Sequence, residues 1–434
     1  MGLGSSLNAG VMGLAVNATK LNTISDNIAN SETVGYKRAE AEFTSMVLES
    51  SGGAYQAGGV RSATYKDVTA QGALLSTNNS TDLSVAGGGL IPVTTIQGVN
   101  STTGDRPLQL TATGSFTPDK NGLLRTLSGL YLMGWPANPD GTVTVPGRDS
   151  ASGLEPVDIN RNQFASAPTS YVQLGVNVPA SATDAGESGD SFDLPVEYFD
   201  NLGRSQAINF AFTPQIPATG SSNTWTVEVF DQAGDPTVAV ATFEVEFDDS
   251  TVAGGSILNV TPGAGSTYDA TTGEVGINVL SGPINVDIGT PGSGGPLTQL
   301  SATFSPVGIE KDGAPIGSFN RVEIDDNGFL QAIFDNGFRR TIYQIPLADV
   351  PNENGLTPLD NQSFAISQAS GDLFFWDAGN GPVGTTVGFS LAESTTDVAE
   401  ELTELIQTQR AYSSNAKIVQ TVDEMLQETT NLKR

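Results

Sequence analysis

The chain of 434 residues contains neither cysteine nor histidine. Without cysteine it can form no disulfide, no thiolate nucleophile and no cysteine-ligated zinc or iron–sulfur site. Without histidine it lacks the commonest general base, the Ser–His–Asp triad and histidine-ligated metals. Most familiar catalytic and metal-binding sites are therefore excluded, and the sequence indicates neither an enzyme nor a cofactor.

Positive charge is scarce as well. The chain has 19 lysine and arginine residues against 48 aspartate and glutamate residues, which gives a formal net charge of −29. Because nucleic-acid binding needs cations that neutralise phosphates, this balance argues against a nucleic-acid partner. No stretch reaches the roughly 18 consecutive apolar residues that indicate a membrane-spanning helix. Residues 1–7 also lack the basic and apolar regions of a cleaved secretory signal.

Glycine and proline are abundant instead. The 50 glycines and 23 prolines predict many turns and a chain that is mainly β. Asp140-Gly141, Asn327-Gly328 and Asn336-Gly337 each lie between apolar residues, which is the strongest short-range signal of a hairpin. Apolar residues alternate with polar ones over 225–230 and 243–247, the pattern of strands with one buried face.

One stretch has the start of a calcium-binding loop. The first, third, fifth and sixth positions of such a loop are occupied by Glu323, Asp325, Asn327 and Gly328. The twelfth position, which must supply a bidentate carboxylate, is Phe334. We therefore interpret the stretch as a hairpin turn and expect no metal site.

The two ends of the chain differ from the β-rich middle. Residues 5–29 contain no proline, and apolar residues recur there every seven positions, as in a helix that packs on another helix. The stripe of this first helix consists of Leu7, Leu14, Leu21 and Ile28, with Ile24 between the last two. A second helix near the C-terminus follows a predicted N-cap at Thr395 or Thr396. Its stripe consists of Val398, Leu402, Leu405, Ile406, Tyr412, Val419, Val422 and Leu426.

Neither helix can bury its stripe alone, so the stripes must meet each other or those of another copy. An intramolecular bundle beneath a β domain is the simpler arrangement. Gly10 and Gly13, however, each weaken an isolated helix by about 1 kcal/mol relative to alanine. A marginal helix with one apolar stripe is suited to ordering during assembly, so the sequence leaves both alternatives open.

Two motifs point to a family. Asn-Ile-Ala-Asn-x-x-Thr-x-Gly-Tyr-Lys starts at Asn27, and Gln-Arg-x-Tyr-x-x-Asn-Ala-Lys starts at Gln409. The residues that carry the likeness are Asn27, Ile28, Asn30, Thr33, Gly35 and Tyr36 in the first motif, and Gln409, Arg410, Asn415 and Ala416 in the second. With these motifs the chain resembles the bacterial flagellar rod and hook family. The agreement continues through 71–74, 129–135 and 326–348, and leaves about 164–306 unmatched.

The resemblance implies a fold and a domain order. The implied fold is α+β, mainly β, in which the terminal helices pair as a coiled-coil-like core domain and inserted β domains project outward in series. Residues 1–30 and 393–434 would form the helical core of a tube. The rest would comprise an extended connecting segment at 31–86, an inner β domain at 87–163 and 307–392, and an outer inserted β domain at 164–306.

The resemblance also implies a mechanical function. Chain length and the large insert favour the hook type of subunit over the shorter rod type, which forms a straight tube. A hook subunit polymerises into a bendable helical tube that transmits torque from the rod to the filament and encloses the export channel. A secreted β-rich binding protein with helical tails is the alternative from another class.

The implied partners belong to the same assembly. They are further copies of the chain, a hook-capping protein, rod proteins, hook–filament junction proteins and the flagellar type III export apparatus. The resemblance places the protein outside the cell, in the hook of a bacterial flagellum, exported without a cleaved signal peptide.

Overall fold

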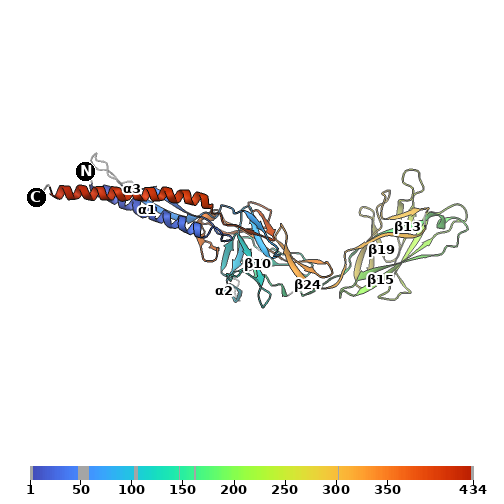
Figure 1. The fold of residues 1–434 in the computed structure, drawn as a ribbon. Coiled ribbons are helices and arrows are strands. Elements are labelled where there is room, and N and C mark those ends of the chain that lie inside the picture. The colour runs from blue at the N-terminus through green and yellow to red at the C-terminus, as the bar shows by residue number, and fades with distance from the viewer. Residues whose placement is uncertain are drawn as a thin grey trace. The chain divides into compact units, whose positions relative to one another are not determined.

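The computed structural model describes residues 3–46, 58–101, 106–145, 147–160, 163–301 and 303–431. The chain divides into two compact units. The terminal unit comprises Met1–Asn162, Arg321–Ile333 and Arg339–Arg434, and the inserted unit comprises Gln163–Asn320 and Phe334–Phe338. Strands dominate both units, and the long helices among the described residues belong to the two ends of the chain (Figure 1). The predicted α+β, mainly β class is therefore confirmed.

The terminal unit holds the helices and many short strands. Its helices are α1 (Leu3–Ala29), α2 (Ile96–Val99) and α3 (Val398–Asn431), with the 3-10 turn η3 (Glu353–Gly355). Its strands are β1 (Ala39–Ser45), β2 (Val60–Lys66), β3 (Leu74–Ser76), β4 (Asp82–Ala86), β5 (Ile91–Thr94), β6 (Leu108–Thr111), β7 (Thr113–Ser115), β8 (Thr117–Pro118), β9 (Leu124–Arg125), β10 (Tyr131–Pro136), β11 (Glu155–Pro156), β26 (Arg339–Gln344), β27 (Leu347–Asp349), β28 (Thr357–Pro358), β29 (Phe364–Ala365), β30 (Phe374–Trp376), β31 (Thr385–Gly388) and β32 (Ser390–Ala392). Two further strands, β24 (Ala314–Ile324) and β25 (Phe329–Phe334), have residues in both units.

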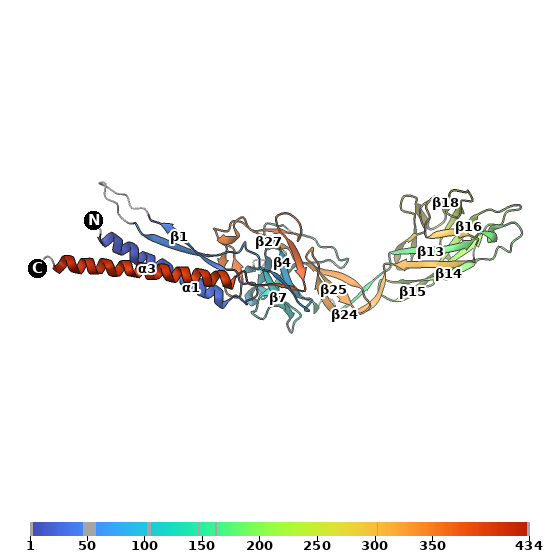
Figure 2. The same ribbon diagram turned by 45° about the horizontal axis from the view of Figure 1, so that its top comes forward.

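The long helices α1 and α3 lie side by side and run in opposite directions (Figures 1 and 2). The predicted pairing of the terminal helices is confirmed, and of the two alternatives the structure shows the helices meeting within one chain. Residues 1–2 and 432–434, which the prediction included in the helical core, lie outside the described residues.

The N-terminal cap of α3 differs from the prediction. Asp397, not Thr395 or Thr396, provides it, because its Oδ1 accepts a hydrogen bond from the backbone N of Ala399 at 2.8 Å. An aspartate at this position also places negative charge at the positive end of the helix dipole. The Oγ1 of Thr395 is used elsewhere, since it accepts a hydrogen bond from the backbone N of Arg38 at 2.8 Å.

The segment 31–86 was expected to be an extended connection, but its described residues contain paired strands. β1 and β2 form an antiparallel hairpin in which Ala39 pairs with Lys66 and Ser45 with Val60, and both strands contact α1 (Figure 2). Farther along, β3 pairs with β32, and β4 lies between β31 and β7. The later part of the segment therefore belongs to the sheets of the terminal unit, because its strands pair with residues near the start of α3.

The β part of the terminal unit is organised around β10. This strand pairs with β5, β9, β11 and β26. Its Trp135 is fully buried and meets Phe375 edge to face, with ring centroids 6.2 Å apart and planes at 74°. Phe375 and β26 follow the inserted unit in sequence, whereas β10 precedes it. The core therefore contains residues from both sides of the insertion.

The glycine turns of the sequence are hairpin turns, as predicted. Gly328 and Gly337 both have φ of 82°. The backbone N of Gly328 bonds to the carbonyl O of Asp325 at 3.1 Å between β24 and β25, and that of Gly337 bonds to Phe334 at 3.0 Å between β25 and β26. Gly141 adopts the same φ in its own turn. The stretch that begins like a calcium loop is thus the β24–β25 turn.

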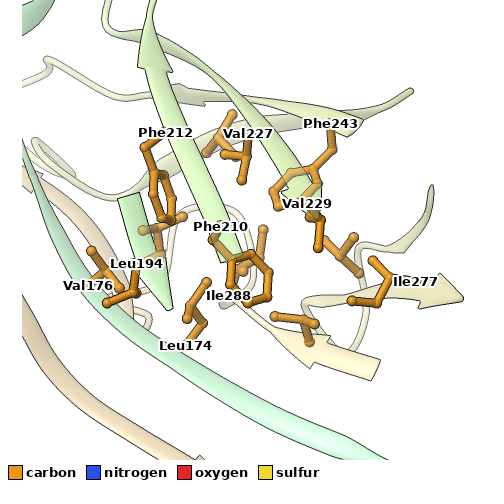
Figure 3. Packing of buried hydrophobic residues seen from close by; sticks show 14 of the residues in the cluster. Leu174, Val176, Leu194, Phe210, Phe212, Val227, Val229, Phe243, Ile277 and Ile288 are labelled. Carbon is orange, nitrogen blue, oxygen red and sulfur yellow. The ribbon is translucent and has the colours of Figure 1, made fainter. Parts of the chain in front are cut away.

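The inserted unit contains two packed sheets. Its elements are β12 (Phe164–Ala167), β13 (Tyr171–Pro179), η2 (Ala180–Thr183), β14 (Phe192–Phe199), β15 (Ser205–Pro214), β16 (Thr224–Asp231), β17 (Ala239–Phe247), β18 (Ile257–Pro262), β19 (Ser266–Asp269), β20 (Glu274–Val279), β21 (Gly282–Asp287), β22 (Leu297–Leu300) and β23 (Ser305–Lys311). One sheet has the order β14-β15-β16-β17-β18, and the other has the order β19-β20-β21-β13-β22 with β23 beside β13. Residues from both sheets, including Leu174, Phe210 and Ile277, form one hydrophobic core (Figure 3).

Two details of the inserted unit bear on the predictions. Alternate residues of β16 and β17 are buried, which confirms the strands predicted at 225–230 and 243–247. The compact unit continues to Asn320, beyond the predicted boundary at 306. The reason is that β23 pairs antiparallel with β13, from Ser305 opposite Asn177 to Lys311 opposite Val172.

Candidate assembly surface on the terminal helices

Glycines allow α1 and α3 to approach closely. Gly10 and Gly13 are both buried. A Cβ atom on Gly13 would lie 2.9 Å from the side chain of Asn415, and one on Gly10 would lie 3.1 Å from Cγ2 of Val419. The glycines that weaken an isolated helix therefore also create the space in which α3 packs.

A hydrogen-bond network joins the end of α1 to the start of α3. Asn27 is only 1% exposed, and its Nδ2 donates to Oε1 of Glu401 at 3.0 Å and to the carbonyl O of Ala39 at 2.9 Å. Its Oδ1 accepts from the backbone N of Ala39 at 2.8 Å. Glu401 is fully buried. A buried carboxylate is costly unless it is paired. The hydrogen bond from Asn27 reduces this cost in the contact between α1 and α3, which we call the seam.

Arg38 supplies the opposite charge for this carboxylate. Its Nε donates to Oε1 of Glu401 at 2.6 Å, and its guanidinium lies within 3.7 Å of Glu40, Glu400 and Glu404. Burial opposes the positive charge, but the hydrogen bond to Glu401 and the surrounding carboxylates outweigh burial and raise the pKa of Arg38. The cation therefore stays charged and anchors the strand after α1 to the first turns of α3.

Tyr36 and Gly35 shape the turn that follows α1. The hydroxyl of Tyr36 donates to Oδ2 of Asp26 at 2.9 Å, and Nζ of Lys66 lies 3.8 Å from the centre of the Tyr36 ring. Burial, reinforced by the bond to Asp26, raises the pKa of Tyr36. Gly35 has φ of 72°, and a Cβ there would lie 2.8 Å from Cγ2 of Thr113. This position of the motif therefore requires glycine.

The other residues of the first motif finish α1. Nδ2 of Asn30 donates to the carbonyl O of Asp26 at 2.9 Å, and Oγ1 of Thr33 donates to Oδ1 of Asn30 at 3.2 Å. Ile28 is half-buried. Beyond the turn, the backbone N of Gly35 bonds to the carbonyl O of Ala392 at 2.8 Å, so the motif lies against the approach to α3.

The second motif lies farther along α3. Gln409 and Arg410 are exposed, Ala416 is half-buried, and Asn415 lies opposite Gly13. Because the helices are antiparallel, the first motif at the end of α1 faces the start of α3 instead. The structure therefore does not bring the two motifs together.

The seven-residue stripes flank the seam rather than form its centre. Leu7, Leu14, Leu21, Leu405 and Val419 are half-buried, and only Ile24 and Val422 among the stripe residues are buried. The centre of the seam includes residues that the sequence analysis did not single out, namely Val16, Asn17, Glu401 and Thr408. Asn17, Glu401 and Thr408 are polar and carry no hydrophobic signal, so only the contact itself reveals them.

Several apolar side chains of α3 face solvent in the single chain. Leu402 is 47% exposed, Ile406 52%, Ile418 47% and Met425 51%. Val398, Tyr412 and Leu426 are also exposed. α1 does not cover these side chains. A helix with apolar residues outside the face that it packs is suited to burial by further elements. We call these seven residues the exposed apolar set of α3.

Other kinds of site find no support in the described part of the chain. No group of three or more acidic residues is placed there to hold a metal ion. None of the helices described is both long and apolar enough to span a membrane.

Comparisons with known proteins address the same elements. Residues 7–37 match the family model described as flagella basal body rod protein, and residues 389–432 match the model of the flagellar basal body rod FlgEFG protein C-terminal region. The flagellar hook protein FlgE of Rhizobium meliloti (strain 1021) is 31% identical over 445 residues, which cover 100% of both chains. The chain belongs to the flagellar hook protein family.

Similarity to other flagellar hook proteins was also found. FlgE of Brucella suis biovar 1 is 31% identical over 440 residues with both chains covered in full. FlgE of Salmonella typhimurium is 26% identical over 440 residues, covering 99% of this chain and 100% of that one. The crystal structure of the Helicobacter pylori flagellar hook protein FlgE2 covers 72% of this chain and 98% of its own, with 13% identity and a TM-score of 0.46.

The resemblance of the terminal motifs to the rod and hook family is thus confirmed. The full-length relatives are hook proteins rather than rod proteins. Both family-model matches fall on the two helices that pair in this chain. The match at 7–37 covers most of α1 and the first motif, and the match at 389–432 covers α3.

Proposed function

We propose that this chain is the structural subunit of a flagellar hook. Many copies polymerise into a bendable helical tube that transmits torque from the rod to the filament and encloses the export channel. The observation that carries the proposal is full-length similarity to hook proteins at 31% identity. The exposed apolar set of α3 supports it, because neighbouring copies would cover those side chains.

The terminal helices are the assembly core in this proposal. One α1–α3 pair presents apolar side chains that it does not bury, and packing against the pairs of other copies removes them from water. Burial of a fully exposed side chain of this kind contributes roughly 1.5–3 kcal/mol, and these side chains, which are already about half covered, would contribute roughly half of that. The stripe residues that are half-buried in one chain would complete their burial in the same contacts.

In this proposal the inserted unit is the outer β domain of the subunit. It has a hydrophobic core of its own, so it does not need the helices for stability. In the tube, both β parts of the chain would then lie outside the helical core. The chain itself needs no catalytic group, because its proposed work is mechanical.

The proposed partners follow from a place in the hook. They are copies of the same chain, rod proteins, a hook-capping protein and hook–filament junction proteins. Delivery through the flagellar type III export apparatus would bring the subunit to its place outside the cell.

Deletion of the gene in its own bacterium tests the proposal. We expect purified basal bodies of the deletion strain to end at the rod in electron micrographs, and expression of the chain from a plasmid to restore hooks and swimming. Normal hooks in the deletion strain would refute the proposal.

A further inference from the structure

The chain contains five asparagine residues that are each followed directly by glycine. They are Asn121, Asn327, Asn336, Asn354 and Asn380, and all five lie in the described part of the chain. Asparagine before glycine is the pair most prone to spontaneous deamidation, because glycine has no side chain to shield its main-chain nitrogen. The structure distinguishes the five pairs, because the reaction depends on how each of these nitrogens is held.

Deamidation needs a main-chain nitrogen that is free to react. The nitrogen of the glycine attacks Cγ of the asparagine, and the new N–Cγ bond closes a succinimide ring. The proton of that nitrogen leaves with the side-chain amide nitrogen as ammonia. Water then opens the ring at either of its carbonyl groups and leaves aspartate or isoaspartate. A hydrogen bond from the glycine N–H must break before the attack, so it slows the reaction.

Four of the five glycine nitrogens are held in this way. The backbone N of each donates to a carbonyl O three positions earlier, with Gly122 bonded to Asp119 at 3.0 Å, Gly328 to Asp325 at 3.1 Å, Gly337 to Phe334 at 3.0 Å and Gly355 to Asn352 at 3.0 Å. Gly122 and Gly328 are also buried. The fold therefore protects these four pairs.

The side chains of Asn336 and Asn354 are fixed as well. Nδ2 of Asn336 donates to the carbonyl O of Pro315 at 2.7 Å, and Oδ1 of Asn354 accepts from the backbone N of Val68 at 2.8 Å. Both amides must leave these partners before Cγ can be attacked. These two positions should therefore be the best protected of the five.

The pair at Asn380 has no such protection. Asn380 and Gly381 are both exposed. Neither the side chain of Asn380 nor the backbone N of Gly381 has a hydrogen-bond partner among the described residues. The residue before Asn380 is Gly379, so no bulky neighbour covers the amide on either side in the sequence.

The fold also requires the glycine that makes this pair reactive. Gly381 has φ of 67°, and a Cβ atom there would overlap the ring of Trp376. A larger residue at position 381 would shield the main-chain nitrogen but would not fit. The reactive pair is thus a consequence of how the turn after β30 packs.

We propose that Asn380 is the site at which this chain deamidates first, with water as the co-reactant. Aspartate and isoaspartate each add one negative charge to the turn between β30 and β31. Isoaspartate also lengthens the main chain by its Cβ atom. The turn is closed by the bond from the backbone N of Gly379 to the carbonyl O of Gly384 at 2.8 Å, which the longer main chain would disrupt. The inference concerns the single chain and does not depend on the proposed function.

Peptide mapping by mass spectrometry tests the proposal on the full-length chain during storage at mildly alkaline pH. The rate of deamidation is measured at all five positions in the folded chain and in the same chain unfolded in urea. The ratio of the folded to the unfolded rate removes the effect of neighbouring sequence. We expect this ratio at Asn380 to exceed the ratios at Asn121 and Asn327 by about fivefold, which corresponds to a net hydrogen bond of about 1 kcal/mol. An equal or higher ratio at any of the other four positions would overturn the proposal.

Asn380→Gln is the variant that isolates the site, because the longer glutamine side chain closes its ring much more slowly. Isoelectric focusing of the stored chain should lose its earliest acidic species in Asn380→Gln. The matched control is Asn327→Gln, at another exposed asparagine before glycine, and it should keep that species. Thermal melting checks that both variants are folded. An early acidic species that persists in Asn380→Gln would contradict the assignment.

Discussion

Asn27 and Glu401, 374 positions apart in the sequence, share a buried hydrogen bond of 3.0 Å. The whole β part of the molecule lies between them in the chain, yet this contact fixes the end of α1 against the first turns of α3. Together with the glycines of α1 it gives the seam a polar, closely packed character. The leucines that make α1 recognisable as a helix remain at the sides of the seam, where other copies can reach them.

Replacement of Asn27 tests the importance of this bond. Asn27→Ala removes a donor from Glu401 and both partners of the Ala39 backbone, so we expect the α1–α3 pairing to weaken by about 1–3 kcal/mol. Hydrogen exchange of the full-length monomer should show faster exchange in both helices, with the inserted unit unchanged. Asn22→Ala, at an exposed position of the same helix, is the control. Equal protection in the two variants would show that the bond is dispensable.

Gly13 tests the close approach of the helices. Gly13→Leu places a side chain where the Cβ alone would already lie 2.9 Å from Asn415, and overpacking typically costs about 1–3 kcal/mol. The matched control is Gly4→Leu, since a Cβ on Gly4 has no atom within 4 Å among the described residues. Circular dichroism and hydrogen exchange should show a loosened seam in the first variant only. An intact seam in Gly13→Leu would mean that α3 can shift at little cost.

Ile406 tests the exposed apolar set of α3. This side chain is 52% exposed in the single chain, so Ile406→Asp should leave the melting temperature of the monomer nearly unchanged. In a polymer that buries this position the new carboxylate has no partner, which is costly enough to block assembly. Sedimentation should find no polymer for Ile406→Asp, whereas Gln407→Asp, at an exposed polar position, should still assemble. Normal polymers from Ile406→Asp would remove this residue from the interface.

Glu353 provides a prediction for pH. Burial raises the pKa of Glu353. The hydrogen bond from the backbone N of Gly89 and the charge of Lys37 lower this pKa, but they offset the effect of burial only in part. The folded chain therefore binds a proton at Glu353 more tightly than the unfolded chain does. The stability linked to this proton is complete below about pH 4 and is lost as pH rises through the raised pKa.

The comparison variant for this prediction is Glu353→Gln, which keeps the shape and removes the titration. The free energy of unfolding of the wild-type chain should fall relative to Glu353→Gln between about pH 4 and about pH 7. Glu353→Gln should therefore be at least as stable as wild type at neutral pH, as measured by denaturant unfolding at a series of pH values. A wild-type advantage that grows with pH would contradict the assigned direction.

Local signals in the sequence predicted much of the fold. Asn327-Gly328 and Asn336-Gly337 fixed hairpin turns because a glycine at positive φ needs no tertiary support. The alternation in β16 and β17 likewise followed from burial of one face. The heptad stripes predicted helices at the ends correctly, but a stripe states only that a face is apolar. It does not state which other surface covers that face.

The centre of the candidate site could not be predicted in the same way. Glu401 resembles any acidic residue in the first turn of a helix, and its burial depends on Asn27 and Arg38, which are distant in sequence. Thr395 and Asp397 are both good N-caps by type, and the choice between them is made by the backbone N of Arg38, which occupies Thr395. Long-range polar contacts decide these positions, and no local pattern reports such contacts.

Electron microscopy of the purified full-length chain, driven to polymerise in solution, tests the central claim most directly. The account predicts hollow tubes that bend, built through the terminal helices. Chains that remain monomeric, or that form only amorphous aggregates, under conditions in which the helices are folded would contradict it.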